Sequence, residues 1–63
     1  MKGYHMSTDA ACAMYLNNIA RQYGLENEFT LAMYGIYEQM QAANITNRFG
    51  LLVHIGQQAV ELI

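Results

Sequence analysis

Few residues in this sequence could carry out chemistry, and they are scattered along the chain. Cys12 is the only cysteine, and a cysteine nucleophile needs a neighbouring base and a positive charge that lowers its pKa. Cys12 instead falls on the apolar stripe of a predicted helix, four residues before Leu16. The pattern therefore predicts a small buried hydrophobic side chain at this position, not a catalytic thiol.

The histidines and carboxylates lack the spacing of a metal centre or an acid–base pair. His5 and His54 are far apart, and neither belongs to a spaced set with Cys, Asp or Glu, although a protein metal site needs three or four ligands. Glu26 and Glu28 flank Asn27, and nothing in the sequence brings two carboxylates together across the fold. We therefore predict no catalytic residues, no metal, no cofactor and no enzymatic activity. His54 could still make an assembly pH-dependent.

Three glycines fall within helical patterns: Gly35, Gly50 and Gly56. None lies between a strand and a helix, as a phosphate-binding loop would require. Glycine inside a helix costs about 1 kcal/mol relative to alanine. These glycines therefore indicate places where the backbones of two helices approach closely at a crossing. The alternative is that the fold tolerates them as positions of low helix propensity.

The spacing of apolar residues predicts an all-α fold of three short helices, near residues 7–23, 27–44 and 47–62. Residues 1–6 carry no periodic pattern and are expected to form a flexible arm, which leaves 7–63 as a single helical domain. The short connections make consecutive helices antiparallel or set them at a steep angle.

Residues that favour helix ends mark the predicted boundaries. The expected N-caps are, in chain order, Ser7 or Thr8, Asn27, and Thr46 or Asn47. Gly24 is expected to end the first helix in a left-handed conformation, with Leu25 folding back onto Ala20 in a Schellman motif. Asn44 is expected to end the second helix in the same conformation, which asparagine tolerates second only to glycine.

The last segment is too apolar for a helix with only one buried face. Between Phe49 and Ile63 the polar side chains recur at helical offsets of zero, three, four and seven, namely His54, Gln57, Gln58 and Glu61. A helix that is apolar around most of its circumference must be covered on more than one side. A short buried strand over 51–55 is the alternative, but the sequence offers no second strand to pair with it.

Size and composition favour self-association. Burial in a chain of 63 residues contributes about 90 kcal/mol, and ordering that chain costs about 95 kcal/mol. One cysteine cannot form an internal disulfide. Charged residues are only 13% and hydrophobic residues 54% of the chain, which leaves few ionic side chains to cover a monomer. We therefore expect the helical bundle to be completed by homo-oligomerisation.

The charge pattern disfavours nucleic acid and membrane partners. The net charge is −2, and the only bases, Lys2, Arg21 and Arg48, are dispersed. Nucleic-acid binding needs several cations close together, and a membrane-surface helix needs a basic polar face. A helix-turn-helix-like nucleic-acid-binding regulator and an amphipathic membrane-surface protein therefore remain as alternatives only.

The expected location is the cytoplasm, or the host cytoplasm if the protein is viral. Residues 1–6 lack the apolar core of a signal peptide. The apolar run 50–53, like every other in the sequence, is far shorter than the about 20 residues of a membrane span. A lone cysteine fits a reducing compartment.

Contact with protein is the function that these features favour. Tyrosine and methionine, each present five times, are enriched in protein interfaces, where charged residues are depleted. The predicted interface residues are Tyr34, Tyr37, Phe49, Leu51, Leu52, Val53, Ile55, Val60 and Leu62. On the third helix, Phe49, Val53 and Val60 lie on one side, whereas Leu51, Ile55 and Leu62 lie on another, and we expect only one side to pack within the subunit. We therefore predict a small non-enzymatic binding protein, bacterial or viral, that works as a homodimer or higher oligomer and regulates or inhibits an unidentified protein target by occluding a site on it.

Overall fold

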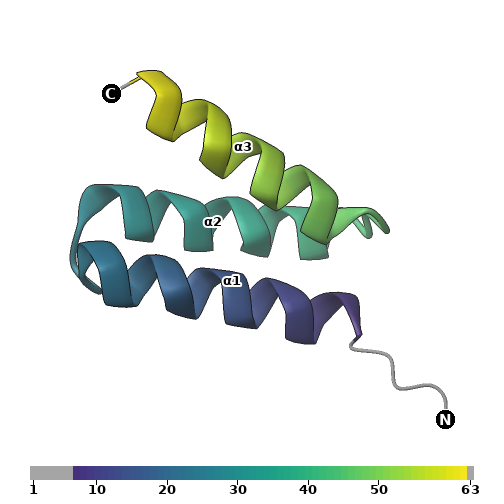
Figure 1. Cartoon of the computed structure of the whole chain (residues 1–63). Coiled ribbons are helices and arrows are strands. Elements are labelled where there is room, and N and C mark those ends of the chain that lie inside the picture. The colour runs from purple at the N-terminus through teal and green to yellow at the C-terminus, as the bar shows by residue number, and fades with distance from the viewer. Residues whose placement is uncertain (1–6, 63) are drawn as a thin grey trace, which may run out of the picture.

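The computed structural model describes residues 7–62, and in this range the chain forms three α-helices and no strand: α1 (Thr8–Tyr23), α2 (Glu28–Ala42) and α3 (Arg48–Leu62). Every pair of helices is in contact. Figure 1 shows α1 and α2 as antiparallel neighbours, with α3 inclined to both and running in the general direction of α1. The predicted all-α architecture is thus confirmed, with helix boundaries that differ by at most two residues from those expected.

Some predictions fall on parts of the chain that the structure does not describe. The predicted arm, residues 1–6, and Ile63 lie outside the described residues. Leu62 belongs to α3, but its side chain is also outside the description. Within 7–62, none of the helices has the length and apolar character needed to cross a membrane.

Side-chain caps begin the first two helices where the sequence predicts them. The Ser7 hydroxyl accepts a hydrogen bond from the backbone N–H of Ala10 at 3.1 Å. Asn27 Oδ1 accepts one from the backbone N–H of Phe29 at 2.8 Å. Each cap satisfies one of the free N–H groups of a helical first turn.

The end of α1 is only partly as expected. Gly24 has a positive φ of 101°, which glycine adopts without steric cost, and its N–H bonds the Ala20 carbonyl at 2.7 Å. Its ψ of 147° lies outside the left-handed helical region, so the conformation predicted for this glycine is wrong. The predicted return of Leu25 onto α1 is wrong, because its side chain is 69% exposed.

The Schellman motif forms instead at the end of α2. Asn44 has a φ of 59°, as predicted, and its N–H bonds the Gln41 carbonyl at 3.0 Å. The Ile45 N–H bonds the Met40 carbonyl at 3.1 Å, and the Ile45 side chain packs against the core. This hydrophobic contact is the usual companion of the motif, and it turns the chain sharply into α3.

The core is built from the apolar stripes of all three helices. Its buried members are Cys12, Leu16, Ile19, Met33, Met40 and Leu52. Thr30 is also fully buried, and its hydroxyl has no hydrogen-bond partner among the described residues. The core is therefore small, which agrees with the marginal stability expected for a chain of this length.

The three helical glycines have three different surroundings. A Cβ on Gly56 would collide with the Tyr15 hydroxyl and would lie 3.2 Å from the Met33 methyl, so this glycine does mark a helix crossing. A Cβ on Gly50 would lie 2.8 Å from Asn47 Oδ1, so that glycine makes room for the residue before α3. A Cβ on Gly35 would meet nothing within 4 Å, and the close approach predicted there is wrong.

Candidate functional site

The thiol of Cys12 is sealed inside the core. It has no exposed surface, and burial raises its pKa, which disfavours the reactive thiolate. His54 is exposed on the outer side of α3, and His5 lies outside the described residues. Within 7–62, no group of three or more His, Cys, Asp or Glu side chains lies close enough to hold a metal ion.

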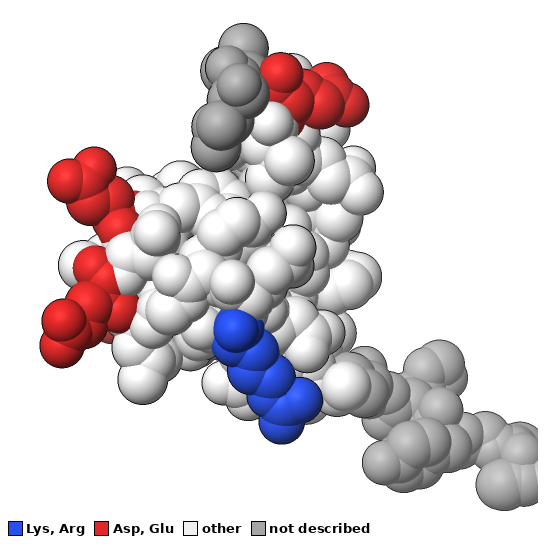
Figure 2. Space-filling model, turned by 60° about the vertical axis from the view of Figure 1, so that its left-hand side comes forward, with Lys and Arg blue, Asp and Glu red and all other residues white. Residues whose placement is uncertain are grey.

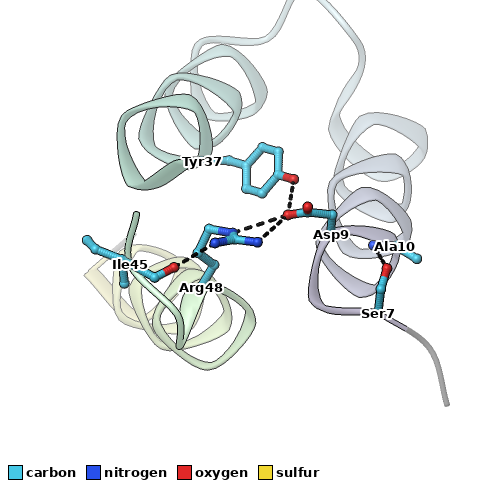
Figure 3. A network of polar contacts seen from close by, with 6 residues as sticks. All are labelled: Ser7, Asp9, Ala10, Tyr37, Ile45 and Arg48. Atoms are coloured by element: carbon cyan, nitrogen blue, oxygen red, sulfur yellow. Dashed lines mark hydrogen bonds and ion pairs between the residues drawn. The ribbon is translucent and has the colours of Figure 1, made fainter. Parts of the chain in front are cut away.

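A polar network joins all three helices at one end of the bundle (Figure 3). Asp9 Oδ1 accepts hydrogen bonds from Tyr37 Oη at 2.8 Å, from Arg48 Nε at 3.1 Å and from Arg48 Nη2 at 2.6 Å. The other terminal nitrogen, Arg48 Nη1, donates to the Ile45 carbonyl at 2.7 Å. The network therefore fixes the start of α1 against both α2 and the start of α3.

The network also changes the protonation equilibria of its members. The hydrogen bond from Tyr37, followed by those from Arg48, lowers the pKa of Asp9. Burial, followed by the hydrogen bond to Asp9, raises the pKa of Tyr37. Both changes keep the aspartate charged and the phenol neutral near pH 7. Nothing in the sequence indicates this network, because its three members come from three separate helices.

A wide polar hollow of about 550 Å³ opens beside this network. It is lined by Asp9, Glu38, Gln41, Ala42, Asn44 and Arg48. The cation among these residues is already paired with Asp9, so the hollow offers no free positive charge to an anionic ligand. We assign the network a structural role.

The row of α3 residues that faces the core lies between the two apolar sides of this helix that the sequence predicts. Leu52 has no exposed surface, and Gly56 is also buried. Phe49, with 41% of its surface exposed, and Val60, with 45%, lie on one side of this row. Leu51, with 37% exposed, lies on the other. The prediction that one whole side packs within the subunit is therefore wrong: the core takes the row between the two sides and leaves both partly uncovered.

An apolar groove runs between α1 and α3, and we call it the α1/α3 groove. One part, a hollow of about 230 Å³, is lined by Ala11, Met14, Tyr15, Asn18 and Phe49. The other part, of about 400 Å³, is lined by Tyr15, Gly56, Gln57, Val60 and Glu61. Tyr15 is common to both parts, and its ring meets that of Phe49 edge to face at a centroid distance of 6.4 Å.

The remaining predicted interface residues are divided between the core and the surface. Tyr34 and Tyr37 are half-buried and pack against the core, and the Tyr37 hydroxyl is engaged by Asp9. Val53 and Ile55 are half-buried, whereas Leu52 lies wholly within the core of its own chain. The side chain of Leu62 is outside the description.

Sequence reasoning missed the contribution of α1 to the exposed apolar surface. Met14 is 53% exposed and lines the α1/α3 groove together with Tyr15. Tyr15 shares the apolar stripe of Cys12 and Leu16 and packs against the core, but it also borders the groove. The one feature of the sequence that indicates this surface is Met14 itself, a large apolar residue that lies off that stripe.

Charged side chains are sparse on the face shown in Figure 2. The acidic groups lie at its left and top edges and one basic side chain crosses its lower part, and the surface between them is formed by uncharged residues. White in that view marks polar and apolar side chains alike, so this face is poor in charge without being wholly apolar.

Comparisons with protein-family models, with curated proteins and with solved structures give no match.

Proposed function

We propose that this protein is a small non-enzymatic binding module that works as a homo-oligomer and regulates or inhibits a larger protein by occluding a site on it. The observation that carries the proposal is the apolar surface left uncovered when the three helices pack. Met14, Phe49 and Val60 line the α1/α3 groove, and each keeps about half of its surface exposed. Side chains of this kind gain stability when a partner covers them.

The distribution of charge supports a protein partner over a nucleic acid. Arg48 is held by Asp9 and the Ile45 carbonyl, so its guanidinium is already engaged. The other described base, Arg21, is exposed at the far end of α1. Phosphate binding draws its affinity from several clustered cations, and residues 7–62 form no such cluster. We expect negligible affinity for duplex DNA or RNA at about 150 mM salt.

Sedimentation velocity across a concentration series tests the homo-oligomer. We expect a dimer or higher oligomer at micromolar concentration, dissociating on dilution. A chain that stays monomeric from nanomolar to high micromolar concentration would contradict this part of the proposal.

Capture from cells of the native host tests the occlusion of a larger protein. The wild-type chain is compared with Phe49→Glu, which places a charge on the exposed apolar surface, and with Gln58→Glu, which places the same charge on the polar strip of α3. We expect one partner to be retained by wild type and Gln58→Glu but lost by Phe49→Glu. Equal retention by all three chains would show that the apolar surface does not bind the target.

A further inference from the structure

We propose that the α1/α3 groove is covered by the same groove of a second copy of this chain, in a two-fold symmetric dimer. This inference rests on the proposed function and deepens it, because it names the face and the occupant. The candidates for such a face are the α1/α3 groove, the opposite side of α3 around Leu51, and the outer surface of α2 around Leu31.

The shape of the groove favours an occupant with alternating ridges and hollows. Its two hollows meet at Tyr15, whose hydroxyl packs closely over Gly56 in the wall of the second hollow. Met14 and Val60 stand at its borders, 53% and 45% exposed. A two-fold interface must be complementary to itself, and a face that carries both hollows and projecting apolar side chains meets that requirement. Methionine adapts its shape to such hollows.

The charge of the groove also matches a second copy. Among the described residues that line its two parts, only Glu61 is charged, and it lies at the end of α3. An occupant rich in charged groups would lose their hydration without gaining partners. The same groove on a second copy brings an equally uncharged surface.

The available area is sufficient for a small dimer. A stable interface needs about 600 to 1,000 Å² from each partner, a modest part of the 4672 Å² that the chain exposes. With 16 residues, α1 is about 24 Å long, and two packed helices are about 20 Å wide. The flat footprint is thus about 480 Å² before the relief of the side chains is counted, which is close to the lower end of that range.

The other two faces are less suited to this contact. Leu31 is 58% exposed, but Glu28 and Glu38 share its side of α2 at helical spacings of three and seven. A two-fold contact there would bring these carboxylates towards their own copies. Leu51 is 37% exposed, the smallest value among the exposed apolar residues of α3 whose side chains the structure describes.

Four single substitutions to glutamate distinguish these faces. Met14→Glu and Val60→Glu place a charge in the groove, whereas Leu31→Glu and Leu51→Glu place the same charge on the two other faces. Dimer dissociation constants are measured by sedimentation equilibrium, and circular dichroism checks that each variant is helical. We expect the two groove substitutions to raise the dissociation constant at least about tenfold and the two controls to change it less than about threefold. If a groove variant loses its helices, Asn18→Glu, an exposed polar position in the same groove, replaces it.

The outcomes separate this inference from the proposed function. If wild type associates but only Leu31→Glu or Leu51→Glu weakens the association, the dimer uses another face; the inference is then wrong and the homo-oligomer survives. If wild type associates and none of the variants weakens it, the groove is likewise not the interface. If wild type is monomeric at every concentration, both the proposed dimer contact and the proposed homo-oligomer are wrong. If the groove substitutions then still abolish capture of the target, the groove is covered by a foreign protein.

Discussion

The carboxylate of Asp9 and the guanidinium of Arg48 are 39 residues apart in the sequence, and their nearest atoms, Oδ1 and Nη2, are 2.6 Å apart in the structure. The contact joins the first turn of α1 to the first turn of α3, and Tyr37 adds α2 through the same oxygen. The arginine side chain is 18% exposed and the aspartate 52%. This chain therefore uses one of its few positive charges to close its own bundle.

The polar network predicts how stability depends on acid. Its hydrogen bonds lower the pKa of Asp9 below the ordinary value of 3.8 in the folded chain. The folded state therefore gains stability above about pH 4, and this gain disappears as the pH falls through the lowered pKa. We expect Asp9→Asn to be less stable than wild type near pH 7 and to lose less stability on acidification. Urea unfolding measured at several pH values checks this.

Glu61→Gln is the control for this prediction. It removes one negative charge at the far end of α3 without touching the network. If Asp9→Asn loses stability with falling pH as steeply as wild type and Glu61→Gln do, then the hydrogen bonds to Asp9 do not contribute to the folded state.

Alanine at Gly35 and at Gly56 should have opposite effects. Both substitutions gain about 1 kcal/mol of helix propensity. Gly35 has open space for a Cβ, so Gly35→Ala should stabilise the chain by about that amount. At Gly56 the added methyl meets the Tyr15 hydroxyl and crowds Met33. Overpacking of this kind costs about 1–3 kcal/mol, so Gly56→Ala should be destabilising on balance. Thermal and urea unfolding measure both changes.

Removal of the Tyr15 hydroxyl tests the cause of the second effect. The contact between Gly56 and Tyr15 is closest at that hydroxyl, so Tyr15→Phe should restore part of the stability that Gly56→Ala loses. A double-mutant cycle isolates the coupling between the two positions. Additive effects would mean that the loss arises elsewhere, for example from Met33.

Local signals in the sequence were sufficient for the helices and most of their ends. Ser7, Asn27 and Asn44 act through hydrogen bonds and backbone angles within a few residues, which is why their positions are predictable. Leu25 illustrates the limit: glycine allows a positive φ but does not decide whether the next side chain returns to the helix.

The candidate surface was only half predictable. The pattern of α3 indicated an excess of apolar residues, and Phe49 and Val60 are indeed exposed. It did not indicate which row of apolar residues along α3 enters the core, because the three rows are equivalent until the positions of α1 and α2 are known. Leu52 was assigned to the interface but is buried, and Met14 was missed, since each depends on the relative rotation of helices.

The thiol of Cys12 should report the opening of the core. It has no exposed surface, and its pKa is raised by burial, so reaction with a maleimide requires an opening of the chain. We expect the reaction to be at least about a hundredfold slower than that of a free thiol and to accelerate in urea. The control moves the cysteine to the exposed neighbour, by Cys12→Ala with Ala13→Cys, and should react almost freely. Equal rates for the two chains would contradict the burial of Cys12.

The buried hydroxyl of Thr30 should lower the stability of the fold. Thr30 has no exposed surface, and its Oγ1 has no hydrogen-bond partner among the residues that the structure describes. A buried hydroxyl without a partner costs about 1–3 kcal/mol in protein data. Thr30→Val keeps the shape and removes this cost, so it should stabilise the chain by about 1 kcal/mol or more. Thr30→Ser keeps the hydroxyl and removes a methyl group, which should destabilise it by about 1 kcal/mol. Urea unfolding of the three chains decides the matter: if Thr30→Val is less stable than wild type, the hydroxyl has a partner, and its hydrogen bond contributes more to the folded state than its burial costs.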